Sequence, residues 1–205
     1  SFVDIARAYF NAKVDEQDPT YVELPEEDPE HGRMCGKLLR HMYGTRRAAD
    51  GWQEEYSSFL VSELGFKQGM PCPFLFVHAD RGIVCNVHGD DFTTRGSKRN
   101  LDWFEAQLQS QYELKVGPRL GPGRSDAKEA LVLNRVVRWT NAGIEYEADP
   151  RQSEKLVREC GLEGGNSAAT PGIAPTAEQL TEDEPLEARL HTAFRSAAAR
   201  GNYLS

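Results

Sequence analysis

The chain has 205 residues and a net charge of −8, and 39% of its residues are hydrophobic. This composition is typical of a globular protein and predicts one large domain, or one domain with a small appendage. The apolar runs are too short for a membrane-spanning helix, and no charged stretch followed by an apolar run opens the chain, so we expect no secretory signal. The excess of acids disfavours binding of duplex phosphates through overall charge, so any role with nucleic acid needs a local basic patch or metal ions.

The cysteines and the first residue indicate the context of the chain. The chain has four cysteines, Cys35, Cys72, Cys85 and Cys160. They form no C-x-x-C pair, and no histidine lies at zinc-finger spacing from them. This pattern favours reduced thiols in an intracellular protein. The chain begins with Ser1 rather than Met, so we expect it to be a piece of a longer protein.

Charge is segregated near the start of the chain. Residues 15–30 are rich in Asp and Glu, contain no Lys or Arg, and are interrupted by prolines, which predicts an exposed hairpin or loop. Residues 33–47 reverse the sign, with Lys and Arg but no acid. A charge run is usually only a solvated face, but this basic run precedes a predicted helix and can present a patch beside a groove.

The middle of the chain predicts a helix followed by hairpins. A helix over residues 50–64, with Asp50 as its N-cap and Gly65 as its stop, has one apolar stripe. The stripe contains Trp52, Tyr56, Phe59, Leu60 and Leu64. Apolar runs at 74–78 and 83–88 flank a Gly-containing turn, and a second turn at 89–91 leads to a strand at 92–94. A second helix follows Ser97 and turns Leu101, Phe104 and Leu108 toward a core.

The last third of the chain predicts a loop, a hairpin and two helices. Residues 117–130 are rich in Gly and Pro and predict the loop, and residues 131–139 and 144–147 predict the hairpin. Helices are expected over 151–160 and 186–200, with a linker over 161–175. Intermixed strands and helices in which hairpins dominate predict an α+β fold on an antiparallel sheet.

Three carboxylates are the sharpest chemical feature. Asp90 and Asp91 directly follow an apolar strand, and Asp4 lies within the apolar segment 2–5. Taken separately, the pair reads as an ordinary acidic β-turn and Asp4 as a charge on an edge or on a solvent face. If segment 2–5 lies beside the 83–88 hairpin, the three form a cluster that repels itself without counter-ions, and their hard oxygens suit Mg²⁺. Two ions about 4 Å apart would then support in-line phosphoryl transfer.

The order of motifs resembles the reverse transcriptase of copia-type LTR retrotransposons. The first three segments are residues 4–12, similar to D-V-K-x-A-F-L-N-G, residues 21–25, similar to Y-M-x-Q-P, and residues 39–52, similar to L-x-x-S-L-Y-G-L-K-Q-A-P-R-A-W. The next two are residues 64–76, similar to L-G-F…D-x-C-L-F, and residues 87–91, in the place of Y-V-D-D. Segments 144–162, 170–171 and 194–204 resemble the end of that domain. The match therefore covers nearly the whole chain in the right order.

The resemblance implies a right-hand polymerase palm with partial fingers over residues 1–150 and a partial thumb or connection over 151–205. It implies that the catalytic and metal-binding residues are Asp4 and Asp90, as the principal ligands, and Asp91, as the third carboxylate. It also implies nucleotide-binding and nucleic-acid-binding residues. The nucleotide-binding set is Tyr9, which would stack under the incoming sugar and clash with a 2′-hydroxyl, with Arg47, Ile5 and Ala6. The nucleic-acid-binding set is Arg46, Arg40 and His88.

Several positions depart from the motifs of that family. His88 and Gly89 replace the Tyr and Val of Y-V-D-D, and Arg47, Ala49 and Asn134 stand where Gln, Pro and Gly are usual. The three carboxylates are retained, which favours a metal site. The substitutions around them indicate a divergent or decaying copy. The chain also begins at the first catalytic strand of that family, without its upstream finger strands, so we expect a truncated copy.

We therefore expect an RNA-directed DNA polymerase fragment of a retrotransposon polyprotein, which adds deoxynucleotides to a primer 3′-hydroxyl with two Mg²⁺, or with Mn²⁺ in their place. The expected partners are an RNA or DNA template-primer and a dNTP, with no membrane. Adjoining RNase H and integrase segments are expected in the polyprotein but lie outside this chain. The expected location is intracellular, in a cytoplasmic particle or the nucleus.

Two alternatives to an active polymerase stay open. The first is a catalytically inactive nucleic-acid-binding remnant of the palm. The second is an unrelated metal-dependent phosphotransferase, such as a nucleotide cyclase, which predicts no template dependence.

Overall fold

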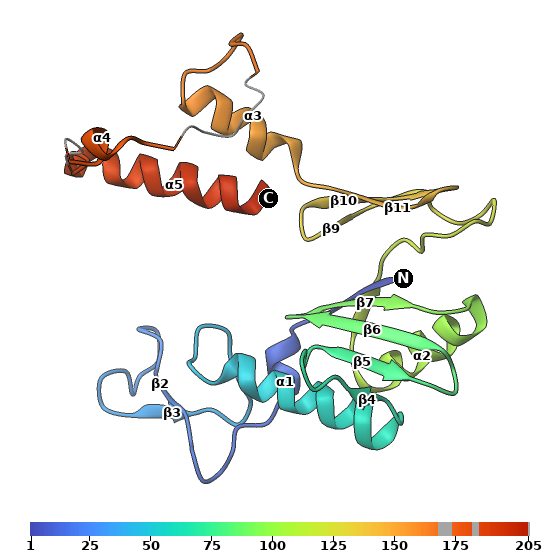
Figure 1. Cartoon of the computed structure of the whole chain (residues 1–205). Coiled ribbons are helices and arrows are strands. Elements are labelled where there is room, and N and C mark those ends of the chain that lie inside the picture. Colours follow the sequence, from blue (N-terminus) through green and yellow to red (C-terminus); the bar gives the residue numbers. More distant parts are fainter. Residues whose placement is uncertain (168–173, 182–184, 205) are drawn as a thin grey trace. The chain divides into compact units, whose positions relative to one another are not determined.

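The computed structural model of the chain describes residues 1–167, 174–181 and 185–204. The chain divides into two compact units, Ser1–Arg119 and Leu120–Ser205, which are coloured from blue to yellow-green and from yellow to red in Figure 1. The boundary expected at residue 150 falls inside the second unit, at the first residue of a helix.

An antiparallel six-stranded sheet forms the centre of the first unit. Its strand order is β4-β5-β6-β7-β1-β8, so the first strand of the chain lies between two strands that follow it much later. The strands are β1 (Phe2–Ile5), β4 (Lys67–Gln68), β5 (Leu75–His78), β6 (Ile83–His88), β7 (Asp91–Arg95) and β8 (Leu114–Val116). The predicted strands at 2–5, 74–78, 83–88 and 92–94 are confirmed, whereas the apolar pattern does not predict β8.

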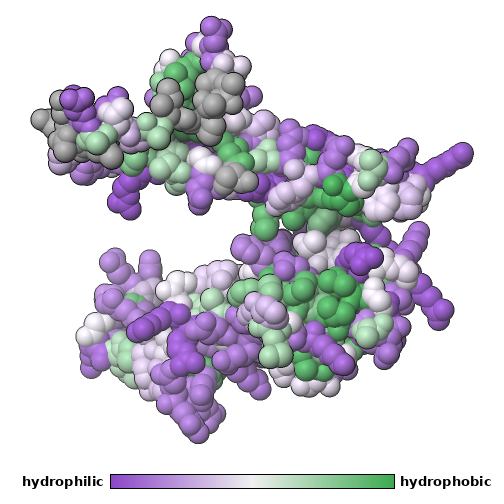
Figure 2. Space-filling view, in the orientation of Figure 1, coloured by the Kyte–Doolittle hydropathy of each residue, from purple (hydrophilic) through white to green (hydrophobic). Residues whose placement is uncertain are grey.

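Within the first unit, helices cover one face of this sheet and leave the other open. Along β6, Ile83, Cys85 and Val87 are buried, while Asn86 and His88 are exposed, as expected for a strand with one solvated face. The buried face packs against two helices, α1 (Ala48–Ser58) and α2 (Lys98–Gln111). The open face is not uniformly polar, and Figure 2 shows hydrophobic side chains over β5, β6 and β7.

The apolar stripe of the predicted 50–64 helix is confirmed, but the ends of the helix differ from the prediction. The helix begins at Ala48, Arg47 is its N-cap without a side-chain hydrogen bond, and Asp50 lies in the first turn instead of capping it. The last turns widen into a π-helix, η2 (Phe59–Glu63), and Gly65 ends them with a φ of 75°, a conformation that glycine adopts without strain. For α2, the Ser97 hydroxyl accepts a hydrogen bond from the Asn100 amide, as an N-cap should.

Two smaller elements complete the first unit. A short 3₁₀ helix, η1 (Ala8–Asn11), follows β1. The acidic and basic segments form an exposed hairpin, β2 (Tyr21–Glu23) paired with β3 (Cys35–Lys37), which confirms the prediction for the acidic run.

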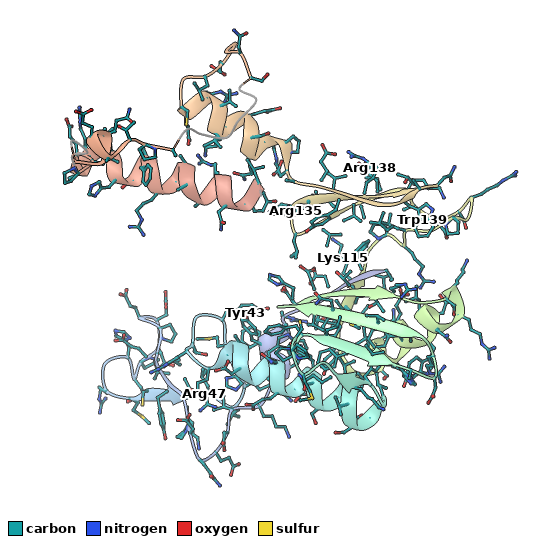
Figure 3. All side chains as sticks on the ribbon, in the orientation of Figure 1. Tyr43, Arg47, Lys115, Arg135, Arg138 and Trp139 are labelled. Atoms are coloured by element: carbon teal, nitrogen blue, oxygen red, sulfur yellow. The ribbon has the colours of Figure 1, made fainter. Side chains whose placement is uncertain are left out.

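The second unit contains a three-stranded antiparallel sheet and helices. Its elements are β9 (Glu129–Val132), β10 (Arg135–Thr140), β11 (Gly143–Glu147), α3 (Pro150–Glu159), α4 (Ala177–Thr181) and α5 (Ala188–Leu204). The Arg135 guanidinium lies over the rings of Tyr203, at 4.3 Å, and Tyr146, at 5.3 Å, so α5 is tied to this sheet. Figure 3 labels Arg135 with its neighbours on β10, Arg138 and Trp139.

The prediction of one strand over residues 131–139 is wrong. Leu133 and Asn134 have φ values of 49° and 60°, so they form a tight turn between β9 and β10. Asn tolerates this left-handed conformation, but Leu adopts it rarely. Because Leu133 is not a typical turn residue, the sequence gives no signal for a turn at this position. The predicted loop over 117–130 also ends earlier, because β9 begins at Glu129.

Part of the predicted C-terminal organisation lies outside the described residues. This concerns the middle of the 161–175 linker and the Thr170-Pro171 segment. The predicted helices at 151–160 and 186–200 correspond to α3 and α5 with shifts of a few residues at their ends. Among the described helices, none combines the length and the apolar character that a membrane span needs.

The six-stranded antiparallel sheet and the helices that pack on it confirm the predicted α+β class.

Candidate metal and nucleotide site

The first strand brings Asp4 directly opposite Asp91. In the pairing of β1 with β7, Asp4 faces Asp91 across the ladder. The amide of Ile5 donates to the carbonyl of Asp90 at 2.9 Å, and the amide of Thr94 donates to the carbonyl of Ser1 at 2.8 Å. Hydrogen-bonded and non-hydrogen-bonded pairs alternate along an antiparallel ladder, and these two bonds mark hydrogen-bonded positions on either side of Asp4 and Asp91. Asp4 and Asp91 therefore form a non-hydrogen-bonded pair, the type in which facing side chains come closest. The expected approach of the N-terminal acid to the acidic doublet is therefore present.

Asp90 lies in the two-residue turn that joins β6 to β7. His88 and Asp91 face each other, Gly89 has a φ of 64°, and Asp90 follows it, which makes a hairpin turn with glycine at the first central position. The indole Nε1 of Trp52 donates to the Gly89 carbonyl at 2.8 Å, so α1 anchors the turn from the covered side of the sheet. Asp90 thus belongs to a turn that is held at the edge of the open face.

The carboxylates belong to a row of ionisable side chains that runs across four strands. His88 on β6 faces Asp91 on β7, Asp91 faces Asp4 on β1, and Asp4 faces Lys115 on β8. We call His88, Asp91, Asp4 and Lys115 the cross-strand row. Sequence reasoning missed Lys115, because only the pairing of β8 with β1 places it there; Figure 3 labels it.

The negative charges in this row are poorly compensated. Burial raises the pKa of the Asp91 carboxyl above its ordinary value of 3.8, the charges of Asp90 and Asp4 raise it further, and His88 lowers it. None of the ion pairs among the described residues involves Asp4, Asp90 or Asp91. The three carboxylates therefore repel one another, and a divalent cation would relieve that repulsion.

The donor set fits Mg²⁺, but the side chains are not gathered around a common point. Carboxylate oxygens are the ligands that Mg²⁺ prefers, and one or two of them suffice when substrate phosphates complete the shell. In residues 1–167, 174–181 and 185–204, no group of three His, Cys, Asp or Glu side chains is arranged to hold a metal ion as it stands. Binding would require the carboxylates of Asp4, Asp90 and Asp91 to turn toward one ion.

The predicted aromatic residue has a second tyrosine beside it. Tyr9 is half-buried in η1, where it packs against the hydrophobic core, and its ring centroid lies 4.4 Å from that of Tyr43. Burial raises the pKa of the Tyr43 phenol, and the charge of Asp90 raises it further. Sequence reasoning missed Tyr43, because it comes from a loop before α1 that only the tertiary fold brings next to η1.

The predicted basic contacts lie apart from the cross-strand row, except for His88. The Arg47 guanidinium forms an ion pair with the Asp18 carboxylate of the acidic segment, with an N–O distance of 2.5 Å. The charge of Arg47 is therefore compensated within the protein. Figure 3 shows Arg47 at the N-terminal end of α1. Arg46 lines an open depression there together with Asp18, Thr20, Arg47 and Asp50. Arg40 donates to the main-chain carbonyl of Asn11 at 2.6 Å.

Ile5 and Ala6 have their main-chain amides occupied by the sheet. Ile5 is fully buried and donates to Asp90, while Ala6 donates to the carbonyl of Glu113 at 2.8 Å. Ala6 also lines a shallow depression with Arg7, Phe10, Asn11 and Glu113, next to η1. Any contact of these two residues with a nucleotide therefore involves the surface of Ala6 rather than a free amide.

Comparison with models of known protein families finds no match for this chain, and comparison with curated proteins finds none either.

Proposed function

We propose that the chain is part of a reverse transcriptase similar to those of copia-type retrotransposons and that the open face of the six-stranded sheet is its catalytic face. The observation that carries this proposal is the pairing of Asp4 with Asp91 beside Asp90, on a palm-like antiparallel sheet whose other face is covered by helices. In this proposal the first unit is the palm with partial fingers, and a partial thumb belongs to the second unit. The reaction is addition of a deoxynucleotide to a primer 3′-hydroxyl.

In this proposal, the role of each residue of the site follows from its place on a strand or in the turn. Asp4 and Asp91 are held in register by two strands, so they form the fixed part of a metal site, and Asp90 supplies a third carboxylate from the turn. When bound there, Mg²⁺ or Mn²⁺ would neutralise the triphosphate and lower the pKa of the attacking hydroxyl. Trp52 keeps the turn in place through its bond to Gly89. Catalysis of this kind depends on positioning and on charge, so no covalent enzyme intermediate is needed.

The partners in this proposal are an RNA or DNA template-primer and a dNTP. The net charge of −8 disfavours binding through overall charge. Template and nucleotide would therefore bind through local groups and through the metal ions. The intracellular location and the neighbouring RNase H and integrase segments belong to the same proposal.

The experiment is primer extension by the full chain on a homopolymeric RNA template with a DNA primer, with Mg²⁺ and with Mn²⁺. Parent and variants Asp4→Asn, Asp90→Asn and Asp91→Asn are compared, and Asp80→Asn serves as the matched control. Asp80 is an exposed carboxylate in the turn at the other end of the β5–β6 hairpin. We expect extension by the parent and the control, and its loss by at least about 100-fold in the three variants, since the removed charge acts on the transition state.

Each outcome decides between the readings of the site. Extension that survives Asp4→Asn, Asp90→Asn or Asp91→Asn refutes the metal assignment. Template-primer binding by the parent without extension supports the alternative of an inactive nucleic-acid-binding palm. Nucleotide turnover without template dependence supports the unrelated phosphotransferase.

A further inference from the structure

Three aromatic rings pack together where η1 meets the loop before α1, and Tyr43 contacts the other two. The ring of Tyr43 lies 4.4 Å from that of Tyr9, at an interplanar angle of 41°, and 5.8 Å from that of Phe10, at 66°. Both partners come from η1, the short helix that follows the strand of Asp4. Tyr43 thus packs against the element that carries the predicted sugar-contacting ring, and Figure 3 shows it in the loop before α1.

The phenol of Tyr43 lies within electrostatic range of the acidic turn. Burial raises the pKa of this phenol, the charges of Asp90 and Tyr9 raise it further, and the main-chain amides of Ala8 and Tyr9 lower it. Tyr43 therefore relates the three aromatic rings to Asp90 in the turn between β6 and β7.

The short helix η1 is held by the core on one side and covered by Tyr43 on the other. It is only four residues long and begins after Arg7, a non-glycine residue with a φ of 53°. Ala8 is fully buried, and Tyr9 packs against the hydrophobic core. Phe10 is 44% exposed and Tyr43 is 46% exposed, so solvent reaches the outer side of this cluster, where the ring of Tyr43 contacts that of Tyr9.

We propose that Tyr43 is a positioning residue that fixes the Tyr9 ring beside the carboxylates and so determines how strongly the site prefers deoxyribonucleotides to ribonucleotides. This inference rests on the proposed function, in which Tyr9 lies under the incoming sugar. A ring excludes a 2′-hydroxyl only if it cannot rotate away, and Tyr43 blocks that rotation by its ring contact with Tyr9. Tyr43 itself does not touch the nucleotide.

The test measures binding of dTTP and of 5-methyl-UTP, which differ only by the 2′-hydroxyl, by calorimetry. The full chain is supplied with Mg²⁺, an adenine-containing RNA template and a DNA primer that lacks its 3′-hydroxyl. The variants are Tyr43→Ala, which removes the ring, and Tyr43→Phe, which keeps the ring but removes the hydroxyl. Tyr21→Ala is the matched control, because Tyr21 is an exposed tyrosine on β2. The readout is the ratio of the two dissociation constants, which a purely structural weakening would not move.

We expect the parent and Tyr21→Ala to prefer dTTP to the same degree. Tyr43→Ala should reduce that preference by about 2- to 13-fold, which corresponds to the ~0.5–1.5 kcal/mol of one aromatic pair, while binding of dTTP changes less than that of 5-methyl-UTP. Tyr43→Phe should reduce the preference by a smaller factor. If Tyr43→Ala does not fold, as seen from its far-UV circular dichroism, Tyr43→Phe carries the test.

The outcomes separate this inference from the proposed function. A parent that prefers dTTP, together with Tyr43 variants that keep its ratio unchanged, overturns the role of Tyr43 and leaves the metal site standing. A parent that binds both nucleotides equally well overturns the inference as well, since no preference exists to be positioned. A parent that binds neither nucleotide with Mg²⁺ overturns the proposed function and this inference with it.

Discussion

Replacing Asp4 by Asn is expected to stabilise the metal-free protein, although it removes a residue that we place in the active site. Asp4 and Asp91 face each other in a non-hydrogen-bonded pair, so their Cβ atoms are about 4.5–5.5 Å apart. Like charges opposite each other destabilise a sheet by up to about 1 kcal/mol. Lys115 flanks Asp4 on its other side and offsets part of this repulsion. We therefore expect a net gain of roughly 0.5 kcal/mol at neutral pH and low salt.

Magnesium should reverse the order of stability between the two proteins. An ion that binds only the folded protein stabilises it by about 1.4 kcal/mol at ten times its dissociation constant. The parent should gain this amount, and Asp4→Asn should gain much less, because it has lost one ligand. Asp4→Asn is then the more stable protein in EDTA, and the parent is the more stable one in Mg²⁺.

The assay is urea unfolding in a Trp139→Phe background, followed by tryptophan fluorescence. The remaining tryptophans, Trp52 and Trp103, both lie in the first unit, so the signal reports on that unit alone. Ionic strength is matched with NaCl, and Asp80→Asn is the control. The reasoning is refuted if Asp4→Asn is clearly less stable than the parent in EDTA, or if Mg²⁺ shifts both midpoints equally.

Two further predictions concern the same unit. Because the pKa of Asp91 is raised above 3.8 in the folded protein, the folded state holds its proton more tightly than the unfolded state, and the ionised form costs stability as pH rises above that value. The stability of Asp91→Asn relative to the parent should therefore increase between pH 4 and pH 7 in urea titrations, and a constant difference would show that the burial and charges around Asp91 do not act on folding. Gly51→Ala should destabilise the first unit by about 1–3 kcal/mol despite the better helix propensity of Ala, because a Cβ atom at Gly51 would lie 2.1 Å from Nε2 of His41. The loss should shrink in the Gly51→Ala, His41→Ser double variant, and additive effects in this double-mutant cycle would contradict a steric cause.

The local elements of the first unit follow from short-range patterns. The alternation of apolar and polar residues over 83–88 sets which face of β6 is buried, and the stripe from Trp52 to Leu60 sets the buried side of the helix. Both patterns have a period that the backbone geometry imposes, so they can be read without knowing the fold. The carboxylates Asp4, Asp90 and Asp91 stand out in the same way, since each lies within or beside an apolar strand.

The partners of these residues depended on tertiary structure. Strand order β7-β1-β8 is not consecutive in the chain, and it alone placed Lys115 next to Asp4. The contact of Tyr43 with Tyr9 and the ion pair of Arg47 with Asp18 are likewise seen only in the folded chain. Contacts between residues distant in sequence follow from how whole faces pack together. Local sequence patterns therefore determined which side chains could bind a metal ion or a nucleotide. Only the packing of the folded chain decided which of these side chains lie next to one another.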